Sequence, residues 1–167
     1  CPLPCPASAL PCPLQVHQKH SCPFYTDAAV QAITAQERGQ PLFLYVAWQE
    51  VHAPNQGAPT SHAPPWGSRL DDVKQKNLWD EVKRYQSMIS CVDESTQKVV
   101  TALKSKHMWE DTLMLWSSDN GPAYYAASHL SRSNKPFFGW KDSNYEGGVR
   151  LAAFLAGGVL PPNAPKR

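Results

Sequence analysis

Two continuous apolar runs, separated by one long amphipathic stretch, constrain the fold of this chain more than any other feature. The runs cover residues 41–48 and 112–117, and both are rich in strand formers. Between them, apolar side chains recur at helical spacing from about Leu78 to Lys106. This order of strand, long helix and strand predicts a βαβ unit with parallel strands. The unbroken apolarity predicts strands that are buried, the first of them on both faces.

Shorter elements surround this unit. We expect a helix that is capped by Thr26 or Asp27, runs to about Arg38 and is stopped by Gly39. Residues 53–68 are rich in proline and predict a loop. A third apolar strand is expected at about residues 151–156. The fold class is therefore α/β, with ligands expected beyond the carboxyl ends of the strands.

Residues 1–23 differ from the rest of the chain. They hold four of the five cysteines, each followed by proline, a composition that is incompatible with a helix interior or a central strand. A disulfide or metal cluster that uses His17 and His20 is one interpretation, and an irregular arm outside the fold is the other, which we favour. Cys91 stands alone on an apolar helix face and is expected to be a buried hydrophobic side chain.

Composition excludes several functional classes. The 167 residues suffice for one domain, and a hydrophobic fraction of 42% is typical of globular chains. Basic residues are scattered and nearly balanced by acidic ones, which leaves a net charge of +2 and argues against nucleic-acid binding. No apolar run is long enough to span a membrane.

Three polar positions carry candidate chemistry. Asp119 and Asn120 follow the second apolar run and could offer two oxygen ligands to a hard cation, although an Asn-Gly sequence is also common in plain turns. His52 follows the first run and could donate a proton or bind an anion, unless it is merely structural. Lys141 could bind a sulfate or phosphate oxygen, unless it is an ordinary surface lysine.

Together these segments resemble the sulfatase family, most closely its arylsulfatase B-like group, over roughly residues 24–160. The motifs stand in the family's order: residues 41–54 (PLFLYVAWQEVHAP), Tyr85 and Asp93 on a long helix, residues 115–121 (LWSSDNG), residues 139–141 (GWK) and residues 145–150 (YEGGVR). The resemblance implies an alkaline-phosphatase-like α/β fold, with a sheet flanked by helices and incomplete in this chain. Residues 1–23 would then be an arm and residues 24–167 a partial catalytic domain.

The resemblance also implies roles for the candidate residues. Asp119 and Asn120 would be two ligands of one calcium ion, His52 would contact the sulfate ester and help protonate the leaving oxygen, and Lys141 would hold a sulfate oxygen. The reaction would be hydrolysis of a small-molecule or carbohydrate sulfate ester. The resemblance further implies a secreted, periplasmic or lysosomal location, which is usual in the family.

The family's nucleophile, a formylglycine made from a cysteine in Cys-x-Pro/Ala-x-Arg, has no counterpart here. Residues 5–9 come nearest, but Ala9 stands where arginine is required and the segment lies too close to His52 for the family's layout. We therefore expect the nucleophile upstream and little activity from the chain alone. Two alternatives remain: a related phosphodiesterase or phosphonate hydrolase of the same superfamily, and a noncatalytic remnant that binds calcium or an anion.

Overall fold

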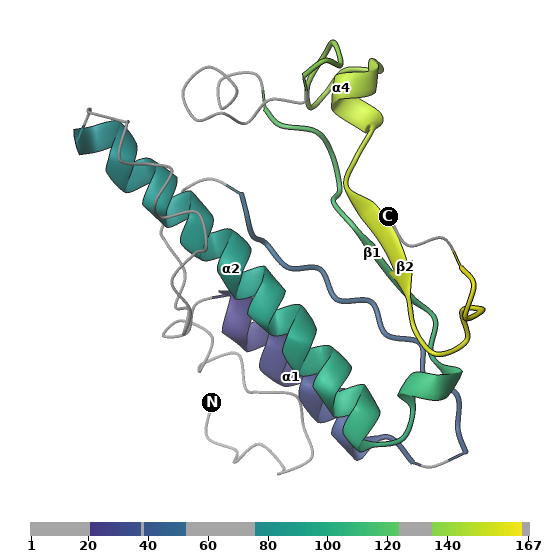
Figure 1. Ribbon diagram of the computed structural model, residues 1–167. Helices are drawn as coiled ribbons and strands as arrows, with labels where there is room; N and C mark the ends of the chain where they lie inside the picture. Colours follow the sequence, from purple (N-terminus) through teal and green to yellow (C-terminus); the bar gives the residue numbers. More distant parts are fainter. Residues whose placement is uncertain (1–20, 38, 53–75, 124–134, 165–167) are drawn as a thin grey trace, which may run out of the picture. The chain divides into compact units, whose positions relative to one another are not determined.

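The computed structural model describes residues 21–37, 39–52, 76–123 and 135–164, with the backbone alone for residues 76–84 (Figure 1). The chain divides into two units. The first contains residues 1–74 and 83–107, and the second contains residues 75–82 and 108–167. The predicted arm before residue 21 and the predicted loop at 53–68 lie outside the described residues.

Helix α1 spans Ser21–Ala35, so it begins before the predicted cap and ends before the predicted stop. Pro23 is tolerated because it lies in the first turn, where its missing N–H has no intrahelical acceptor to lose. Thr26 is not a cap: its buried hydroxyl donates to the Cys22 carbonyl oxygen at 2.7 Å, inside the helix. Gly39 follows the helix with a φ of +90°, the left-handed conformation expected of a glycine there.

Helix α2 spans Lys76–Ser105 and confirms the long amphipathic helix. The buried side chains that the structure describes on it recur at helical spacing; they are Met88, Cys91, Val92, Ser95, Val99 and Leu103. Gln97, Lys98 and Lys104 are exposed and form the solvated face of this amphipathic helix. Ile89, although apolar, is 41% exposed.

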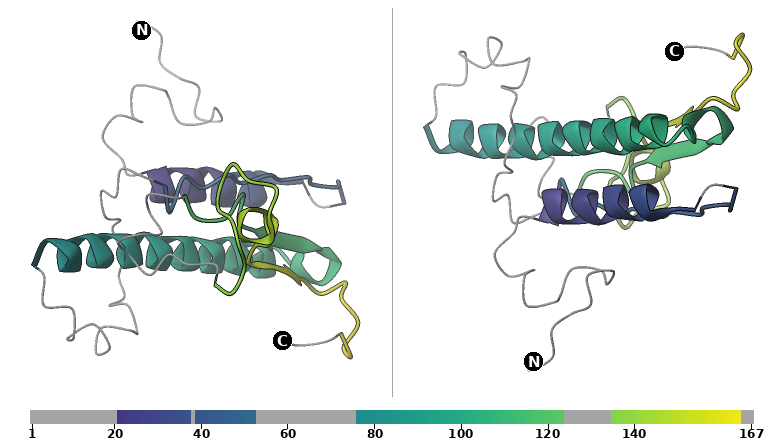
Figure 2. Two further views of the ribbon diagram at one scale, coloured as in Figure 1. Left: turned by 90° about the horizontal axis from the view of Figure 1, so that it is seen from above. Right: turned by 90° about the horizontal axis from the view of Figure 1, so that it is seen from below.

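Helices α1 and α2 lie side by side and run in the same direction (Figure 2). A disulfide joins Cys22 near the start of α1 to Cys91, and the Lys106 ammonium donates to the Thr34 carbonyl oxygen at 3.0 Å near the far end. Cys91 is buried, as predicted, but the expectation that it stands alone was wrong, because it is disulfide-bonded. Its partner Cys22, assigned to the irregular arm, is carried on α1 and faces α2.

The predicted strand at residues 41–48 is not a strand in the described structure. Phe43 is 93% exposed and Tyr45 is 82% exposed, so the expectation of burial on both faces was also wrong. Because this segment pairs with no described strand, the predicted βαβ unit is not formed in the described part of the chain. The physical reason is that an apolar run becomes a buried strand only where neighbouring strands and covering layers are present.

The second unit holds a two-stranded antiparallel sheet of β1 (Met114–Ser117) and β2 (Ala153–Ala156). Both strands lie within the predicted apolar runs, but they are not fully buried, and Leu115 is 69% exposed. Trp116 lies opposite Phe154 in the register, and their rings stack with centroids 5.4 Å apart. At one end of the sheet, Gly158 N–H donates to the carbonyl oxygen of Trp109 in η3 (Trp109–Asp111) at 2.9 Å. Among the described helices, none is long and apolar enough to cross a membrane.

Candidate functional site

The Asp119–Asn120 turn follows β1 directly, as predicted. The Asp119 carboxylate is exposed and accepts a hydrogen bond from the Asn120 backbone N–H at 2.8 Å. The half-buried Asn120 amide nitrogen donates to the Gly121 carbonyl oxygen at 2.9 Å. An amide that donates through nitrogen keeps its side-chain oxygen as an acceptor. The turn therefore presents a carboxylate and an amide oxygen on adjacent residues.

Two backbone hydrogen bonds join this turn to the Lys141 segment. Gly121 N–H donates to the Gly148 carbonyl oxygen at 2.9 Å, and Lys141 N–H donates to the Pro122 carbonyl oxygen at 2.9 Å. Segments well separated in sequence are thus fixed side by side within the second unit. The candidate metal ligands and the candidate anion-binding lysine therefore lie on two backbone segments that are hydrogen-bonded to each other.

The Gly-Gly pair of α4 (Glu146–Val149) makes this arrangement possible. Gly147 N–H donates to the Phe138 carbonyl oxygen at 2.7 Å. A methyl group on Gly147 would collide with the Gly139 carbonyl, and one on Gly148 would lie 2.5 Å from the Trp140 carbonyl oxygen. The close backbone approach expected of the glycine pair is therefore present, and it shapes the loop that carries Lys141.

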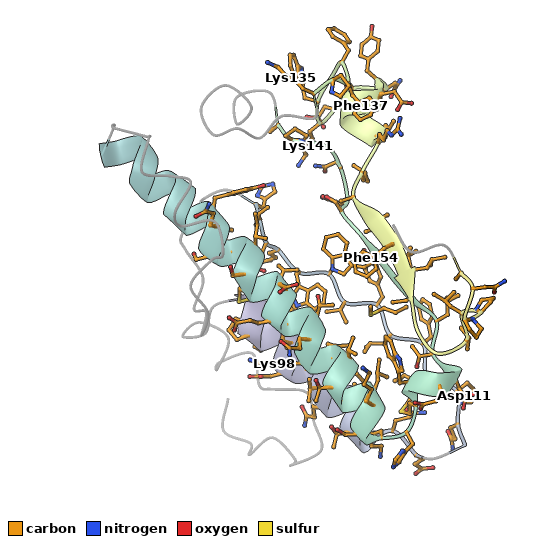
Figure 3. The ribbon with its side chains drawn as sticks, viewed as in Figure 1. Lys98, Asp111, Lys135, Phe137, Lys141 and Phe154 are labelled. Atoms are coloured by element: carbon orange, nitrogen blue, oxygen red, sulfur yellow. A yellow bond between two sulfur atoms is a disulfide. The ribbon has the colours of Figure 1, made fainter. Side chains whose placement is uncertain are left out.

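Lys141 is half-buried between two residues that turn the chain. Gly139 has a φ of +93° and Asp142 a φ of +70°, both in the left-handed region. Close to this loop, Glu146 pairs with Arg150 at 3.4 Å, and the Arg150 guanidinium lies 4.5 Å from the centre of the Phe137 ring. Figure 3 shows Lys141 and Phe137 in the part of the chain around α4. Two cationic side chains, Lys141 and Arg150, thus lie before and after α4 in the same part of the second unit.

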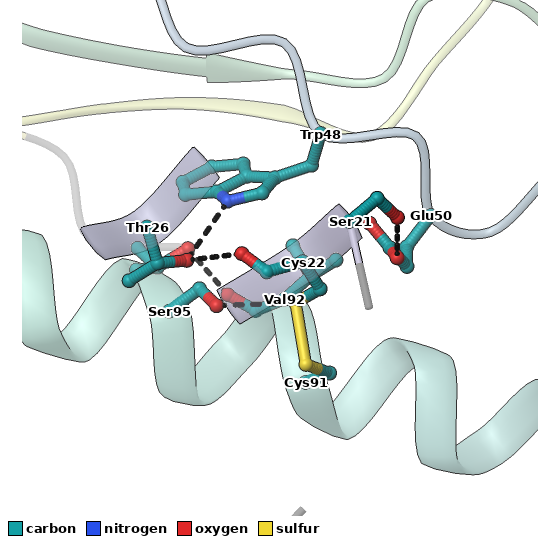
Figure 4. Close-up of a disulfide and its surroundings, with 9 residues drawn as sticks. Ser21, Cys22, Thr26, Trp48, Glu50, Cys91, Val92 and Ser95 are labelled. Atoms are coloured by element: carbon teal, nitrogen blue, oxygen red, sulfur yellow. Dashed lines mark hydrogen bonds between the residues drawn. A yellow bond between two sulfur atoms is a disulfide. The ribbon is translucent and has the colours of Figure 1, made fainter. Parts of the chain in front are cut away.

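His52 belongs to the first unit, at the end of the 41–52 segment. Its backbone N–H donates to the Gln49 carbonyl oxygen at 3.0 Å, and the residue is exposed. Glu50 accepts a 2.7 Å hydrogen bond from the Ser21 hydroxyl, which ties the turn to the start of α1 (Figure 4). Trp48 donates from its indole nitrogen to the Thr26 hydroxyl at 3.2 Å. Two side chains near His52 therefore anchor its segment to α1.

The donor set fits part of a calcium site. Calcium takes six to eight oxygen ligands, and the exposed Asp119 carboxylate and the Asn120 amide oxygen are of the right type. Among the residues whose positions the structure describes, no group of three or more His, Cys, Asp or Glu could hold a metal ion. This turn therefore fits as two of the ligands of such an ion.

Some features of the site were not visible in the sequence. The anchoring of the His52 segment through Trp48 and Thr26 has no sequence motif, because the two residues meet only when α1 and the extended segment fold together. The disulfide was hidden for the same reason: its cysteines lie 69 positions apart in the chain. Spacing alone does not reveal a pairing of that kind.

Comparison with known proteins gives a consistent result. The model of the family described as Sulfatase matches residues 8–157, which is most of the chain. Among curated proteins, mouse arylsulfatase J (Mus musculus) is 33% identical over 141 residues, which are 84% of this chain. Human N-acetylgalactosamine-6-sulfatase (Homo sapiens) is 29% identical over 144 residues, or 86% of this chain.

A solved structure is also similar. It is described as Ps i-CgsB in complex with k-i-k-neocarrahexaose, and it matches 81% of this chain with a TM-score of 0.61 and 26% sequence identity. The chain spans a small part of each of these proteins: 21% of the mouse protein, 24% of the human protein and 28% of the Ps i-CgsB chain.

Proposed function

This chain belongs to the sulfatase family, and on that premise we propose that it contributes part of an active site that hydrolyses sulfate esters. The family and the solved neighbour imply the alkaline-phosphatase-like α/β fold. In our proposal the described helices and strands are pieces of a larger sheet flanked by helices. Residues 24–167 would form the partial catalytic domain, and residues 1–23 an arm.

One observation carries the proposal. Two backbone hydrogen bonds join the Asp119–Asn120 turn to the segment that carries Lys141: Gly121 N–H donates to Gly148, and Lys141 N–H donates to Pro122. Hard oxygen donors and an ammonium group are thereby held in one piece of structure. The oxygen ligands would hold a cation that binds the negatively charged oxygens of a sulfate ester, and the ammonium group would bind one of these oxygens directly.

Each residue has a proposed role. Asp119 and Asn120 would ligate one calcium ion, which when bound supplies a Lewis acid and a template for the sulfate group. Lys141 would bind a sulfate oxygen and offset its charge. His52 would contact the ester and hold the proton that passes to the leaving oxygen. The nucleophile would come from residues outside this chain.

The proposed substrate class is a small-molecule or carbohydrate sulfate ester. Two similar proteins support the carbohydrate part: one is named N-acetylgalactosamine-6-sulfatase, and the other was solved with a neocarrahexaose. Lys141 before α4 and Arg150 directly after it supply cationic charge of the sign that attracts such a substrate. We further propose an oxidising compartment, secreted, periplasmic or lysosomal, because the buried disulfide of Cys22 and Cys91 persists where thiols are not kept reduced.

The proposal can be tested in a chimera in which this chain's residues replace the 141 matched residues of mouse arylsulfatase J. The chimera should hydrolyse 4-methylumbelliferyl sulfate in calcium-containing buffer. Asp119→Ala, Lys141→Ala and His52→Ala should each lower kcat/KM by about 100-fold or more, the usual effect of removing one charge-stabilising group. Lys98→Ala, an exposed lysine on the solvated face of α2, is the matched control and should change little.

Three results would contradict this function. Faster hydrolysis of bis(p-nitrophenyl) phosphate than of the sulfate ester would favour a phosphodiesterase. An equal effect of Lys98→Ala and Lys141→Ala would remove Lys141 from the site. Calcium-dependent turnover by the 167-residue chain alone would contradict the expectation that its site is partial.

A further inference from the structure

Aromatic side chains gather on the segment that carries Lys141. Phe138 is 69% exposed, Tyr145 is 58% exposed and Trp140 is 37% exposed. Between ring centroids, Phe138 lies 4.8 Å from Tyr145 and 6.4 Å from Trp140. We call these three residues the aromatic cluster. Exposed rings that contact one another make an apolar patch, and an apolar patch rimmed by polar side chains is typical of a binding surface.

The backbone holds the aromatic cluster in place. The Phe138 carbonyl oxygen accepts a hydrogen bond from Gly147 N–H at 2.7 Å. A methyl group on Gly139 would lie 2.6 Å from the β-carbon of Tyr145, so the chain between Phe138 and Trp140 packs directly against Tyr145. Rings that are already ordered lose little conformational entropy when a ligand covers them.

Cationic side chains lie beside these rings. Lys141 follows the last residue of the Phe138–Trp140 stretch, and the Arg150 guanidinium lies 4.5 Å from the centre of the neighbouring Phe137 ring. Residues 135–150 carry three cationic side chains and two carboxylates in all. The surface of this segment therefore combines apolar rings with a small excess of positive charge.

A sulfated carbohydrate matches both properties. Its sulfate groups are anionic, and the C–H faces of its sugar rings pack against the negatively polarised faces of aromatic rings. We propose that the aromatic cluster is a stacking surface for the sugar units next to the one that bears the reacting sulfate, and that it selects oligosaccharide sulfates over small aryl sulfates. Phe138 lies three positions before Lys141, so their α-carbons are at most about 11 Å apart, a distance that a short oligosaccharide can span. The inference rests on the proposed function, because it takes Lys141 as the residue that holds the reacting sulfate.

A protein partner fits this surface less well. It would cover the aromatic cluster and with it the approach to Lys141. The exposed Asp142 carboxylate and the hydroxyl of the exposed Tyr145 add hydrogen-bonding groups that match the hydroxyls of a sugar. The segment therefore offers stacking, hydrogen bonding and positive charge together, and a sulfated sugar uses all three.

Binding by the 167-residue chain tests this surface without turnover. The probes are hexasaccharides of chondroitin sulfate and of carrageenan, the same hexasaccharides after removal of sulfate, and sodium sulfate, each titrated by NMR. At least one sulfated hexasaccharide should bind about 10-fold more tightly than its desulfated form and than sodium sulfate. If no hexasaccharide binds more tightly than about 10 mM, the proposal is overturned.

Variants separate the rings from the charge. Phe138→Ala should weaken binding of the sulfated and the desulfated hexasaccharide alike by about 10-fold, because it removes a stacking contact with sugar, whereas Phe138→Tyr keeps the ring and should bind normally. Lys141→Ala should remove only the advantage of the sulfated form. Phe43→Ala is the matched control, since it deletes a ring that is 93% exposed in the first unit, and it should leave binding unchanged. Equal effects of Phe138→Ala and Phe43→Ala would contradict the stacking surface.

In the chimera with mouse arylsulfatase J, the hexasaccharide is used as a competitor of 4-methylumbelliferyl sulfate. Phe138→Ala should raise the inhibition constant of the hexasaccharide about 10-fold and change the KM of the aryl sulfate less than about 2-fold, because the small substrate does not reach the rings. Equal changes of the two constants would mean that Phe138 has a structural role only, and would overturn the proposal.

Failure of the surface and failure of the proposed function give different results. Hexasaccharide binding that depends on Phe138, in a folded chimera without sulfatase activity or without an effect of Lys141→Ala, would support the stacking surface and count against the function alone. An active chimera that binds no hexasaccharide would do the reverse. A Tyr145 ring that photo-CIDNP NMR finds inaccessible in the folded chimera would be covered by protein, and this would also overturn the stacking surface.

Discussion

At the scale of single residues, Gly147 and Gly148 show how the absence of a side chain positions a site. Gly147 lies against the backbone of Phe138 and Gly139, and Gly148 against that of Trp140 and Ser143. These contacts bring Gly148 to Gly121 and so hold the Asp119–Asn120 turn beside the Lys141 loop. The Gly-Gly pair therefore sets the backbone geometry of the loop that carries Lys141.

Gly148→Ala should break this arrangement. The added methyl group would overlap the Ser143 carbonyl, so we expect the free energy of unfolding of the second unit to fall by about 2–3 kcal/mol, as for other overpacked sites. Exchange of the Gly121 and Lys141 amides should accelerate. Gly39→Ala is the control: it has open space but a positive φ, so it should cost about 1 kcal/mol and leave those two amides unchanged.

Thr26 is the second residue with a predictable effect. Its hydroxyl donates to the Cys22 carbonyl and accepts from the Trp48 indole. Thr26→Val keeps the shape but leaves the indole N–H without this acceptor, which should lower the free energy of unfolding by about 1–2 kcal/mol. The Trp48 indole proton should exchange faster. Thr26→Ser retains the hydroxyl and should behave much closer to the native chain; equal effects of the two variants would contradict this assignment.

Individual residues differ in how far the sequence predicts them. The place of Asp119 and Asn120 directly after β1 was predictable, because a polar pair and a glycine follow an apolar run, whereas their role as metal ligands stays a prediction. The glycine pair near Lys141 predicted a close backbone approach, which the structure confirms, whereas the anion-binding role of Lys141 stays a prediction. The disulfide of Cys91 was not predictable, because burial is common to a free and a bonded cysteine, and the bond depends on where α1 places Cys22.

At the scale of elements, the α1–α2 disulfide is the strongest single constraint in the first unit. Its cysteines are 69 positions apart, and a loop of that size gives about 4 kcal/mol of stabilisation in the chain-entropy treatment. Reduction should therefore lower the free energy of unfolding of the helix pair by about 3–5 kcal/mol. Urea unfolding monitored by circular dichroism, with and without a phosphine reductant, measures the change.

The control for this prediction is the double variant Cys22→Ser with Cys91→Ser. It should unfold at the urea concentration of the reduced native chain and be insensitive to the reductant. If the reductant shifts the double variant as much as the native chain, the effect does not come from this disulfide. An unchanged native chain would show that packing of Met88, Val92 and Ile33 holds the helices without the bond.

The sequence predicted some helices and strands more accurately than others. The long helix, β1 and β2 are present close to their expected bounds, because each is specified by local periodicity or by a short apolar run. Residues 41–48 have the same kind of composition as β1 but pair with no described strand. A strand forms only where a neighbouring strand pairs with it. The local sequence shows a preference for extended structure, but it does not contain the strand that would pair.

At the scale of the whole molecule, calcium provides a test that does not depend on turnover. A calcium ion takes six to eight oxygen ligands, and the Asp119–Asn120 turn offers only two side chains. In the chain alone, a dissociation constant above about 1 mM would limit stabilisation by 1 mM calcium to about 0.4 kcal/mol. We therefore expect almost no rise in the Tm of the 167-residue chain when calcium is added.

In the chimera the same two residues should complete a full ligand set. With calcium at about 100 times the dissociation constant, the stabilisation should reach about 2.7 kcal/mol, a shift of several degrees in Tm that differential scanning calorimetry resolves. Asp119→Ala should abolish the shift, whereas Asp142→Ala, a nearby exposed carboxylate, should preserve it. A large calcium shift in the chain alone that Asp119→Ala removes would mean that the 167 residues hold a complete metal site. The reaction would then depend on residues outside this chain for its nucleophile but not for its cation.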